Sequence, residues 1–529
     1  MAHRASLSRR ISALMLGLSC VSCAPNAAPS LTISRLALAE GDIDCGDGPT
    51  PVSTTDVAIL HLQLTHPERP TFEQRVDIEP GARSVQVGSI PVGEDWDVRL
   101  TGFQSAANFS AGTYSWLGRR AGVDVAADQS TGAGILLLRV EALQCTRAPM
   151  AQPNMLSVAT TLKDGRVLLT GGIDAFSVAD CEGCRWGEAS RRAVLYDPVT
   201  GSFSATASMP DARVGHAASL DGSGRVLIVG GAQRVRLGGE HSVDLGDAGL
   251  RDSSLLFDPS TERWTEVETL WGQRAFHTLT LLNDGSLITA GGFADRGRIH
   301  SDVLRLSVTE DSVRLVETAE AMRCPRVGHQ AFRYLDEVVL WGGSRCTDSD
   351  QSAPEIWSPR AGLRLADTER WGSEANLSFA ASVELQTGTF LIAGGSVYRD
   401  GSLQTPNREN SYYFLAETET HVRAVMLPEG IPALFASAVR LSRGRRAWLG
   451  GGFADLQFNE PRHGYTLFDD NADGFQFAAQ LPGLAGGITA SHAGTNQVLI
   501  AGGASACSDC SPGLRLLNSA AVFSSAEDH

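Results

Sequence analysis

The chain lacks several features that would place it in a common functional class. Lys163 is its only lysine among 529 residues, and 44 Lys and Arg stand against 60 Asp and Glu, giving a formal net charge of −16. Without a basic surface to displace counterions from phosphate, the sequence disfavours binding to nucleic acid or to anionic lipid. No apolar run approaches the roughly 18 residues that a membrane-spanning helix needs.

Glycine, in contrast, is abundant. The 56 glycines exceed the ordinary share of about 7%, and many tight turns are the natural interpretation. With 43% apolar and 20% charged residues the chain is neither disordered nor collagen-like, and it is long enough for more than one domain.

The N-terminus has the pattern of an export signal. Three arginines precede an apolar stretch over residues 11–18, and small residues surround Cys20 and Cys23. We therefore predict a signal peptide over residues 1–22. A cysteine at this place resembles the bacterial lipoprotein signal, which implies lipidation at Cys23 and an exported protein of the cell envelope, an outer-membrane lipoprotein that is periplasmic or surface-exposed. Cys20 as the acylated residue, and cleavage without lipid near Ala27 or Ala28, stay open.

The even number of remaining cysteines agrees with the predicted export of the protein. Without the two cysteines near the signal, eight of the ten remain, and an oxidising compartment favours their pairing. Order along the chain suggests disulfides between Cys45 and Cys145, Cys181 and Cys184, Cys324 and Cys346, and Cys507 and Cys510. A zinc site shared by the two Cys-x-x-Cys segments is the alternative.

One phrase recurs along the chain, a short apolar run closed by Gly-Gly. Its first glycines are separated by 59, 61, 51, 52, 57 and 51 residues, by subtraction of their numbers. Such a period indicates a repeat architecture. The seven copies end in Gly171-Gly172, Gly230-Gly231, Gly291-Gly292, Gly342-Gly343, Gly394-Gly395, Gly451-Gly452 and Gly502-Gly503.

Each copy belongs to a pattern of four short strands. In the second copy, strand-like runs over 216–220 and 225–229 precede a loop and then Phe257-Asp258-Pro259 with Trp264. The Asp-Pro pair predicts a turn between the third and fourth strands. Paired glycines after the second strand permit backbone angles closed to other residues and close approach of neighbouring sheets.

The doublet followed by Tyr196-Asp197-Pro198, or by Phe257-Asp258-Pro259 and Trp264, resembles the kelch repeat over residues 145–529. The resemblance implies a seven-bladed β-propeller with four-stranded blades around a central channel. The last copy ends before its outer strand, so we expect the segment 143–146 to supply it and cover an open edge.

Residues 23–144 carry no doublet and alternate apolar and polar residues over 57–64, 84–90, 96–103 and 134–140. This pattern predicts a small antiparallel β-sandwich, vaguely similar to immunoglobulin-like or transthyretin-like modules, which would serve as a spacer between lipid and propeller. The predicted fold is therefore all-β, with the sandwich in front of the propeller.

Three consecutive copies begin with Arg-x-x-His, at Arg213 and His216, Arg274 and His277, and Arg326 and His329. Equivalent positions in a ring point the same way, so these residues are candidates for the channel rim, as an anion site or a three-histidine metal site. The alternative is that they bond the backbone between neighbouring blades. We predict no metal and no cofactor.

The long loops after the doublets would return to the same face as the Arg-x-x-His segments. Long loops on a rigid scaffold commonly carry binding residues. We place the binding surface there, with Trp186, Trp271, Tyr398 and Arg399 as candidates; the two tryptophans could equally pack between blades.

The expected function is an exported, membrane-anchored binding module for a protein or glycan partner, acting as a monomer and contacting the membrane through its lipid only. The alternative is a carbohydrate-active enzyme, a hydrolase or oxidase with its site at the channel mouth. The resemblance to galactose oxidase-like kelch proteins does not extend to the cross-linked Tyr and Cys of those copper enzymes, which the 7 tyrosines here do not reproduce. No Asp-box of the sialidase type is present either.

Overall fold

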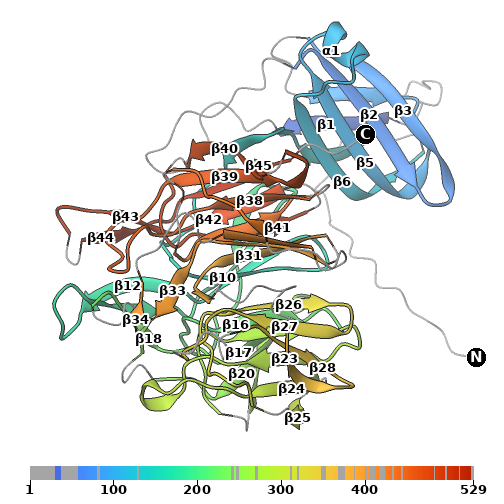
Figure 1. The fold of residues 1–529 in the computed structure, drawn as a ribbon. Helices are drawn as coiled ribbons and strands as arrows, with labels where there is room; N and C mark the ends of the chain where they lie inside the picture. The colour runs from blue at the N-terminus through green and yellow to red at the C-terminus, as the bar shows by residue number, and fades with distance from the viewer. Residues whose placement is uncertain are drawn as a thin grey trace, which may run out of the picture.

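The computed structural model of the chain is built almost entirely of antiparallel β-sheet (Figure 1). In the part of the chain that it describes, the helical segments are α1 (Ala106–Ser110) and two single 3-10 turns, η1 (Asp295–Gly297) and η2 (Asp470–Ala472). None of these described helices has the length and apolar character needed to cross a membrane. The described residues are 30–36, 57–79, 84–127, 130–239, 243–245, 249–268, 272–309, 312–318, 321–346, 353–366, 376–386, 388–399, 402–404, 411–415, 423–429, 431, 434–441, 445–472, 474–481, 483–494, 497–510 and 513–525.

Two sheets form the N-terminal region. Leu31 and Val87 of the smaller sheet share one apolar core with Leu62, Trp96 and other residues of the larger sheet. The alternation predicted from the sequence is present in β2, where Leu60, Leu62 and Leu64 are buried. The smaller sheet has the order β4 (Ser84–Gly88), β1 (Ser30–Leu36), β7 (Ser130–Leu136), and the larger has β3 (Arg69–Asp77), β2 (Ile59–His66), β5 (Gly93–Phe103), β6 (Trp116–Val125), β8 (Leu138–Arg139).

Each Gly-Gly doublet follows the second strand of a four-stranded antiparallel sheet, and the described residues contain seven sheets with a doublet at this position. We call them sheets one to seven in chain order. Sheets one to three are β10 (Val158–Thr161), β11 (Val167–Thr170), β14 (Ala193–Asp197), β15 (Ser202–Ala205); β16 (Ala217–Leu220), β17 (Val226–Val229), β20 (Ser253–Asp258), β21 (Arg263–Glu268); and β22 (Thr278–Leu281), β23 (Leu287–Ala290), β24 (Val303–Val308), β25 (Val313–Thr318). Sheets four to six are β26 (Gln330–Tyr334), β27 (Glu337–Trp341), β28 (Glu355–Ser358), β29 (Gly362–Leu365); β31 (Ala381–Gln386), β32 (Thr389–Ala393), β35 (Ser411–Leu415), β36 (Arg423–Ala424); and β37 (Ser437–Arg440), β38 (Arg446–Gly450), β39 (Gly464–Asp469), β40 (Gly474–Gln480).

Sheet seven is completed from a distant part of the chain. It contains β41 (Thr489–Ala493), β42 (Gln497–Ala501) and β45 (Ala520–Ser524), and its outer strand is β9 (Ala142–Cys145). Val522 lies opposite Gln144 in this antiparallel pair. The predicted outer strand from residues 143–146 is confirmed, and it covers the edge that β45 would otherwise expose.

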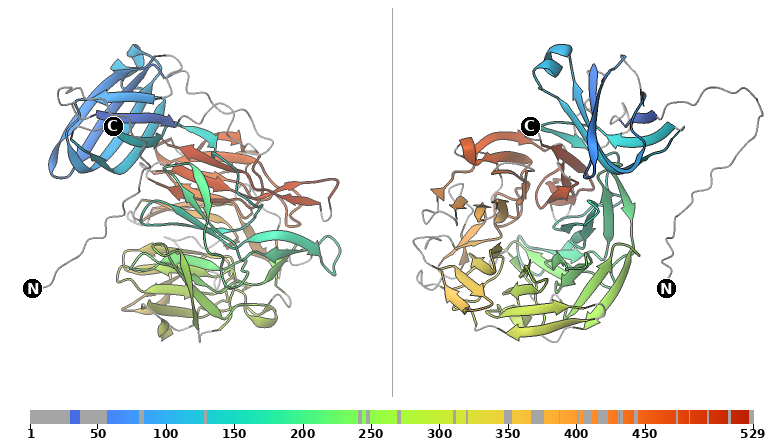
Figure 2. Two further views of the ribbon diagram at one scale, coloured as in Figure 1. Left: turned by 180° about the vertical axis from the view of Figure 1, so that it is seen from behind. Right: turned by 90° about the vertical axis from the view of Figure 1, so that its right-hand side faces the viewer.

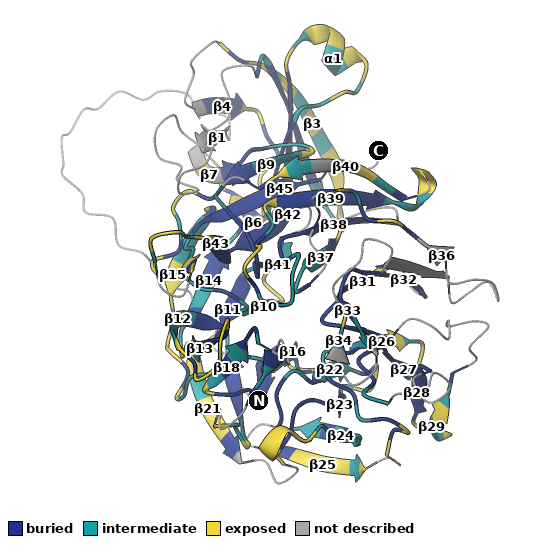
Figure 3. Cartoon of the chain, turned by 60° about the vertical axis from the view of Figure 1, so that its left-hand side comes forward, coloured by how far each residue is buried: buried dark blue, intermediate teal, exposed yellow. Residues whose placement is uncertain are grey.

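The seven sheets follow one another around a central space, as Figure 2 shows in its right-hand view. The last sheet also meets the first, since the Gly503 N–H donates to the Asn154 carbonyl oxygen at 2.7 Å. The second strands are buried throughout their length in sheets one, two and three, which explains why their sequences are continuous apolar runs rather than alternating ones (Figure 3).

The glycine doublets are required at the contacts between sheets. All their residues have positive φ, from 58° at Gly171 to 106° at Gly503. A Cβ on Gly171 would lie 2.3 Å from the Arg213 carbonyl oxygen of the next sheet. Only a residue without a side chain permits both the left-handed backbone and this close approach.

The predicted Asp-Pro turns are present between third and fourth strands. Asp197 Oδ1 accepts the Val199 N–H at 2.8 Å, and Asp258 Oδ1 accepts the Ser260 N–H at 2.8 Å. These side-chain bonds add to the backbone bonds that close the two turns, from the Gly201 N–H to the Asp197 carbonyl oxygen and from the Glu262 N–H to the Asp258 carbonyl oxygen, both at 2.8 Å.

Loop residues form further small sheets on one face of the ring. The largest has the order β12 (Ile173–Val178), β13 (Arg185–Ala189), β18 (Arg234–Leu237), β19 (Val243–Asp244), combining the loops of sheets one and two. We call it the cap sheet, and Figure 1 shows β12 and β18 projecting from the ring. Smaller sheets are β30 (Leu377–Ser378), β33 (Ser396–Arg399), β34 (Ser402–Leu403), and β43 (Ala504–Ala506), β44 (Leu514–Leu516).

The N-terminal region is joined to the ring by side chains as well as by the chain. Glu141 forms an ion pair with Arg446 of sheet six at 3.0 Å. Leu136 and Leu138 are buried in one cluster with Val522 of sheet seven. Charge and apolar packing therefore both fix this junction.

Candidate functional site

The three predicted arginines act as clamps between the backbone segments of the ring. Arg213, Arg274 and Arg326 are completely buried. Their Nη1 atoms donate to the carbonyl oxygens of Gly230, Gly291 and Gly342, the first glycine of the doublet in the same sheet, at 2.8, 3.2 and 2.8 Å. At the same time the carbonyl oxygen of Arg213 accepts the Gly172 N–H of the preceding sheet at 3.0 Å.

Each buried guanidinium has a carboxylate partner. The nearest distances are 2.7 Å from Arg213 to Asp211, 3.0 Å from Arg274 to Asp302 and 3.2 Å from Arg326 to Glu355. Burial lowers the pKa of Arg326, and the Glu355 charge opposes that shift. The prediction that these arginines line the channel rim is therefore corrected, because the guanidinium groups are withdrawn from solvent and engaged with backbone and carboxylates.

Asn154 takes the corresponding position in sheet one. Its Nδ2 donates to the Gly171 carbonyl oxygen at 2.6 Å, and its own carbonyl oxygen accepts the Gly503 N–H. The sequence pattern Arg-x-x-His does not include this residue, because the first copy has Asn154 where the next three copies have arginine. The spacing from Asn154 to the following doublet is the signal that could have found it.

The three predicted histidines lie near the ring axis, buried between neighbouring sheets. Nε2 of His216 lies 3.0 Å from Thr170 Oγ1, and Nε2 of His329 lies 2.9 Å from Thr278 Oγ1. Burial, reinforced by the charge of the arginine three residues earlier, lowers the pKa of His216 and of His329 to about 3. The pKa of His277 is also lowered well below its ordinary value by burial and by the Arg274 charge. All three imidazoles are therefore neutral at neutral pH.

A ring of left-handed residues precedes the inner strands. Leu156, Phe276, Phe379 and Phe435 have φ between 53° and 56°, and the corresponding residues in the other sheets are Gly215, Gly328 and Gly487. Their backbones are linked from sheet to sheet, for example from the Phe379 N–H to the Gly328 carbonyl oxygen at 2.8 Å.

The side chains of three of these residues, Phe276, Phe379 and Phe435, contact one another at the centre of this ring. The rings of Phe379 and Phe435 stack with centroids 4.7 Å apart, and Phe276 meets Phe379 edge to face at 5.8 Å. Such offset and edge-to-face contacts are the favoured aromatic geometries. We call Phe276, Phe379 and Phe435 the aromatic plug.

The cap sheet covers the plug on the side of the long loops. Val235, Leu237 and Val243 belong to the same buried apolar cluster as Phe379 and Phe458. Arg185 Nη2 donates to Asn459 Oδ1 at 2.7 Å, so the cap sheet is bonded to the loop of sheet six. Folded loops and apolar packing therefore lie over the aromatic plug on this face.

The other face of the cap sheet is partly exposed and carries a predicted residue, Trp186, which also packs against the edge of the buried apolar cluster. Trp186 is partly buried and lies opposite Arg236 in the pairing of β13 with β18. The guanidinium carbon of Arg234 lies 4.1 Å from the centroid of the Trp186 ring, and that of Arg236 lies 5.8 Å away. Glu188 and Asp244 share this face by strand register. We call Trp186, Glu188, Arg234, Arg236 and Asp244 the outer cap face.

Of the other loop candidates, Tyr398 has a comparable arrangement. The guanidinium carbon of Arg345 lies 4.4 Å from the Tyr398 ring centroid, and burial lowers the pKa of Arg345 to about 10. The backbone of Arg399 belongs to β33. Trp271 lies outside the described residues, as do Cys20 and Cys23.

The predicted local disulfides are confirmed for Cys181–Cys184, Cys324–Cys346 and Cys507–Cys510. Cys145 is also disulfide-bonded, and its predicted partner Cys45 lies outside the described residues. The Cys181–Cys184 bridge closes the tip between β12 and β13, next to Gly239 of the cap sheet.

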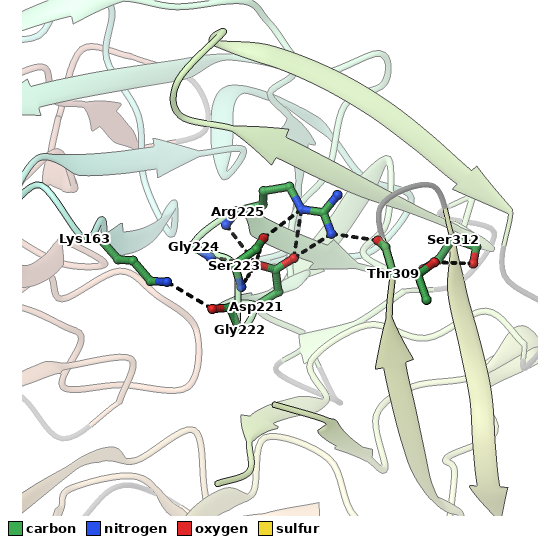
Figure 4. A network of polar contacts seen from close by, with 8 residues as sticks. All are labelled: Lys163, Asp221, Gly222, Ser223, Gly224, Arg225, Thr309 and Ser312. Atoms are coloured by element: carbon green, nitrogen blue, oxygen red, sulfur yellow. Dashed lines mark hydrogen bonds and ion pairs between the residues drawn. The ribbon is translucent and has the colours of Figure 1, made fainter. Parts of the chain in front are cut away.

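The face opposite the cap sheet consists of tight turns with dense polar bonding (Figure 4). Asp221 is nearly fully buried, and burial by itself would raise its pKa, but hydrogen bonds from Ser223 and Arg225 lower it overall. Lys163 of sheet one donates to the Gly222 carbonyl oxygen at 3.0 Å, and Arg225 donates to the Thr309 carbonyl oxygen of sheet three at 2.7 Å. These turns therefore bond three adjacent sheets to one another.

The side chains do not gather into a metal site. Within the described ranges, no three His, Cys, Asp or Glu residues are grouped so that they could hold a metal ion. The three histidines are held apart because each is wedged between a different pair of sheets.

Comparisons with known proteins support a kelch-type fold. No protein-family model matches the chain, and no curated protein matches it in sequence. Among solved structures, the chain is similar to a fungal alcohol oxidase of the AA5 family in complex with copper, with a TM-score of 0.51 and 15% identity over 72% of this chain and 76% of the other. A structure titled YjhT is matched with a TM-score of 0.38 and 15% identity over 62% of this chain and 94% of the other. The first likeness supports the kelch-type, galactose oxidase-like fold and does not extend to activity.

Proposed function

We propose that the chain is an exported binding protein whose seven sheets are the blades of a closed kelch propeller, with residues 145–529 forming the propeller and residues 23–144 a β-sandwich in front of it. The bond from Gly503 to Asn154 and the pairing of β9 with β45 support closure. Closure gives a rigid ring, which is a suitable support for a binding surface.

The same proposal includes anchoring at the envelope. A lipid on Cys23 would attach the protein to the outer membrane, and the sandwich would hold the propeller away from the lipid surface. The disulfides support an oxidising compartment. Membrane contact is then limited to the N-terminal lipid, and the chain acts as a monomer.

The outer cap face is the proposed binding surface, and the stack of Arg234 on Trp186 is the observation that carries it. Tryptophan and arginine are the residue types that dominate binding energy at protein interfaces. The cap sheet beneath them is fixed by Arg185 and by its apolar core. A partner would therefore meet a surface that is already ordered and loses little conformational entropy on binding.

A protein partner fits this surface better than a glycan. The Trp186 ring already carries a guanidinium at 4.1 Å, whereas a sugar ring would need that aromatic face free. The alternation of Arg234 and Arg236 with Glu188 and Asp244 suits a partner that presents both charges in complementary positions.

Site-specific photo-crosslinking in the producing cell tests this proposal. Val178 is 79% exposed at the end of β12, next to Ser177, which lies opposite Trp186 of the outer cap face. Leu335 is 63% exposed in the turn between the first and second strands of sheet four, on the opposite face of the ring. A photoreactive phenylalanine at position 178 should cross-link a discrete partner that position 335 does not.

The double variant W186A/R234A should remove that cross-link and leave the melting temperature within a few degrees of wild type. A W264A variant, which removes a partly buried tryptophan from β21 of sheet two, is the matched control and should keep the cross-link. Equal cross-linking from positions 178 and 335 would contradict the assignment, and specific capture on a glycan array would favour the glycan alternative.

A carbohydrate-active enzyme is the second candidate because of one carboxyl group in the channel. Glu384 lines a cavity with Arg440 and His492, and burial raises its pKa. Glycoside hydrolysis ordinarily needs two carboxyl groups flanking the bond, so this single shifted group makes the enzyme the weaker proposal. If the wild-type protein hydrolyses or oxidises a glycan and an E384Q variant does not, the enzyme would become the stronger proposal.

A further inference from the structure

The aromatic plug leaves a cavity beneath it, on the side away from the cap sheet. Its volume is about 350 Å³. The plug residues Phe276, Phe379 and Phe435 line it together with His216, His277 and His329. Its remaining lining residues come from the inner strands and the residues just before them, in sheets one, four, six and seven among others.

Of these three histidines, His277 is the one whose ring nitrogens both lack a hydrogen-bond partner among the described residues. Its Nδ1 and Nε2 are both buried without a hydrogen-bond partner, and the residue is 7% exposed. His216 uses Thr170 and His329 uses Thr278 as partners, whereas the corresponding positions around His277 hold Val229 and Ala217. A buried imidazole without partners costs free energy unless something in the cavity bonds to it.

The cavity wall is polar but carries no charge. Ser157, Gln330, Ser437 and Thr489 line it, and no Asp, Glu, Lys or Arg is among the described lining residues. The nearest buried arginines are already paired with carboxylates. An ion in this cavity would have no opposite charge beside it, so the wall favours a neutral occupant.

The combination of an aromatic surface with hydroxyl, amide and imidazole groups defines the occupant. A neutral imidazole has one acceptor and one donor nitrogen, and a hydroxyl group can bond to either of them because it both donates and accepts. Sugars and polyols combine such hydroxyls with C–H groups that pack on aromatic rings. We propose that this cavity binds a small neutral monosaccharide or polyol, with its hydroxyls on His277 and its C–H face on the aromatic plug.

This site is separate from the outer cap face, because the plug and the cap-sheet core lie between them. The channel wall continues from the cavity along β37 and β41 toward Glu384, Arg440 and His492. A ligand would therefore enter from the face opposite the cap sheet.

Titration of the full mature chain with single compounds tests the proposal. Glucose, galactose, N-acetylglucosamine and myo-inositol would each be added up to about 50 mM, a range that detects Kd values near 1 mM, and binding would be followed by saturation-transfer NMR and calorimetry. At least one compound should bind at a one-to-one ratio. In H277F the affinity should fall at least about tenfold, equal to about 1.4 kcal/mol.

The matched control is H463F, which alters a partly buried histidine outside the cavity that bonds the Leu484 carbonyl oxygen, and which should bind like wild type. An H277Q variant keeps hydrogen-bonding capacity and should bind better than H277F, even if H277F is less stable. Three results would overturn the proposal. They are equal binding by H277F and wild type, no binding of any of the four compounds, and a crystal soaked with these compounds that shows only ordered water at His277. Cross-linking from position 178 should be unchanged in H277F, so this test and that of the proposed function fail independently.

Discussion

The guanidinium of Arg326 lies 3.2 Å from the carboxylate of Glu355, and both side chains are withdrawn from solvent, at 0% and 3% exposure. The same guanidinium donates to the Gly342 carbonyl oxygen at 2.8 Å. One side chain thus joins the start of the inner strand, the glycine doublet and the third strand of sheet four. Removing one partner of such a pair leaves an uncompensated buried charge.

We expect R326A to lower the free energy of unfolding by about 3–5 kcal/mol. The exposed Arg314 of β25 is the control, and R314A should change stability by less than about 0.5 kcal/mol. Denaturant unfolding followed by tryptophan fluorescence measures both. The double variant R326M/E355L should be more stable than R326A, since it leaves no charge behind; equal losses in R326A and R314A would contradict the clamp role.

Two glycines with left-handed backbones, Gly285 and Gly291, allow the cost of backbone strain to be measured separately from the cost of a steric clash. A Cβ on Gly291 (φ 60°) would lie 2.4 Å from the Arg326 carbonyl oxygen, whereas one on Gly285 (φ 83°) would meet nothing within 4 Å. G285A should cost about 1 kcal/mol from backbone strain alone. G291A should cost at least about 2 kcal/mol more because the backbone of the next sheet cannot move away. Similar melting temperatures for the two variants would show that the doublet is not needed for sheet contact.

The neutral histidines make stability depend on pH. The pKa of His216 and of His329 is about 3 in the folded chain, compared with an ordinary value of 6.5. Between these values the unfolded chain binds more protons, so folding stability is fully present above about pH 6.5 and falls as the pH is lowered toward 3. Each histidine contributes a slope of up to about 1.4 kcal/mol per pH unit.

Denaturant midpoints measured from pH 7 to pH 5 check this dependence. This window lies above the region where the carboxylates with lowered pKa, Asp221, Asp258 and Asp284, become protonated. The variant H216Q/H329Q should be less stable than wild type at pH 7 but should have a flatter pH dependence. An unchanged slope in that variant would assign the pH effect to other groups.

The outer strand of sheet seven should control association. A chain that starts at residue 137 keeps β9, whereas one that starts at residue 148 exposes the edge of β45. Unpaired strand edges promote intermolecular pairing. We expect the shorter chain to form dimers or larger species, measured by size-exclusion chromatography with light scattering, and the longer chain to remain a monomer. If both chains are monomers, β9 is not needed to prevent association.

The sequence was informative wherever a backbone requirement recurred. The doublets marked the end of every second strand, and the Asp-Pro pairs marked turns at Asp197 and Asp258. Counting strands in the last copy was enough to find the missing outer strand. These features are local in the chain, since positive φ and a fixed proline φ constrain residue type directly.

The roles of individual side chains could not be predicted as well from the sequence. Arg-x-x-His was recognised as recurrent, but its arginines proved to be clamps and its histidines wedges between sheets. Trp186 was a candidate without known partners, and Arg234 and Arg236 join it only because β13 pairs with β18 across two repeats. Asn154 was missed because it replaces an arginine with a shorter side chain that reaches the same carbonyl.

By itself, the sequence determined the number and order of the repeated strands, the positions of the glycine doublets and the source of the strand that completes sheet seven. It could do so because strand period, turn chemistry and glycine backbone angles act over a few residues. Only the tertiary structure decided that the long loops cover the plug, that the arginines are withdrawn from solvent and that His277 faces a neutral cavity. Those outcomes depend on contacts between residues tens to hundreds of positions apart, which burial and close packing select after the strands have formed.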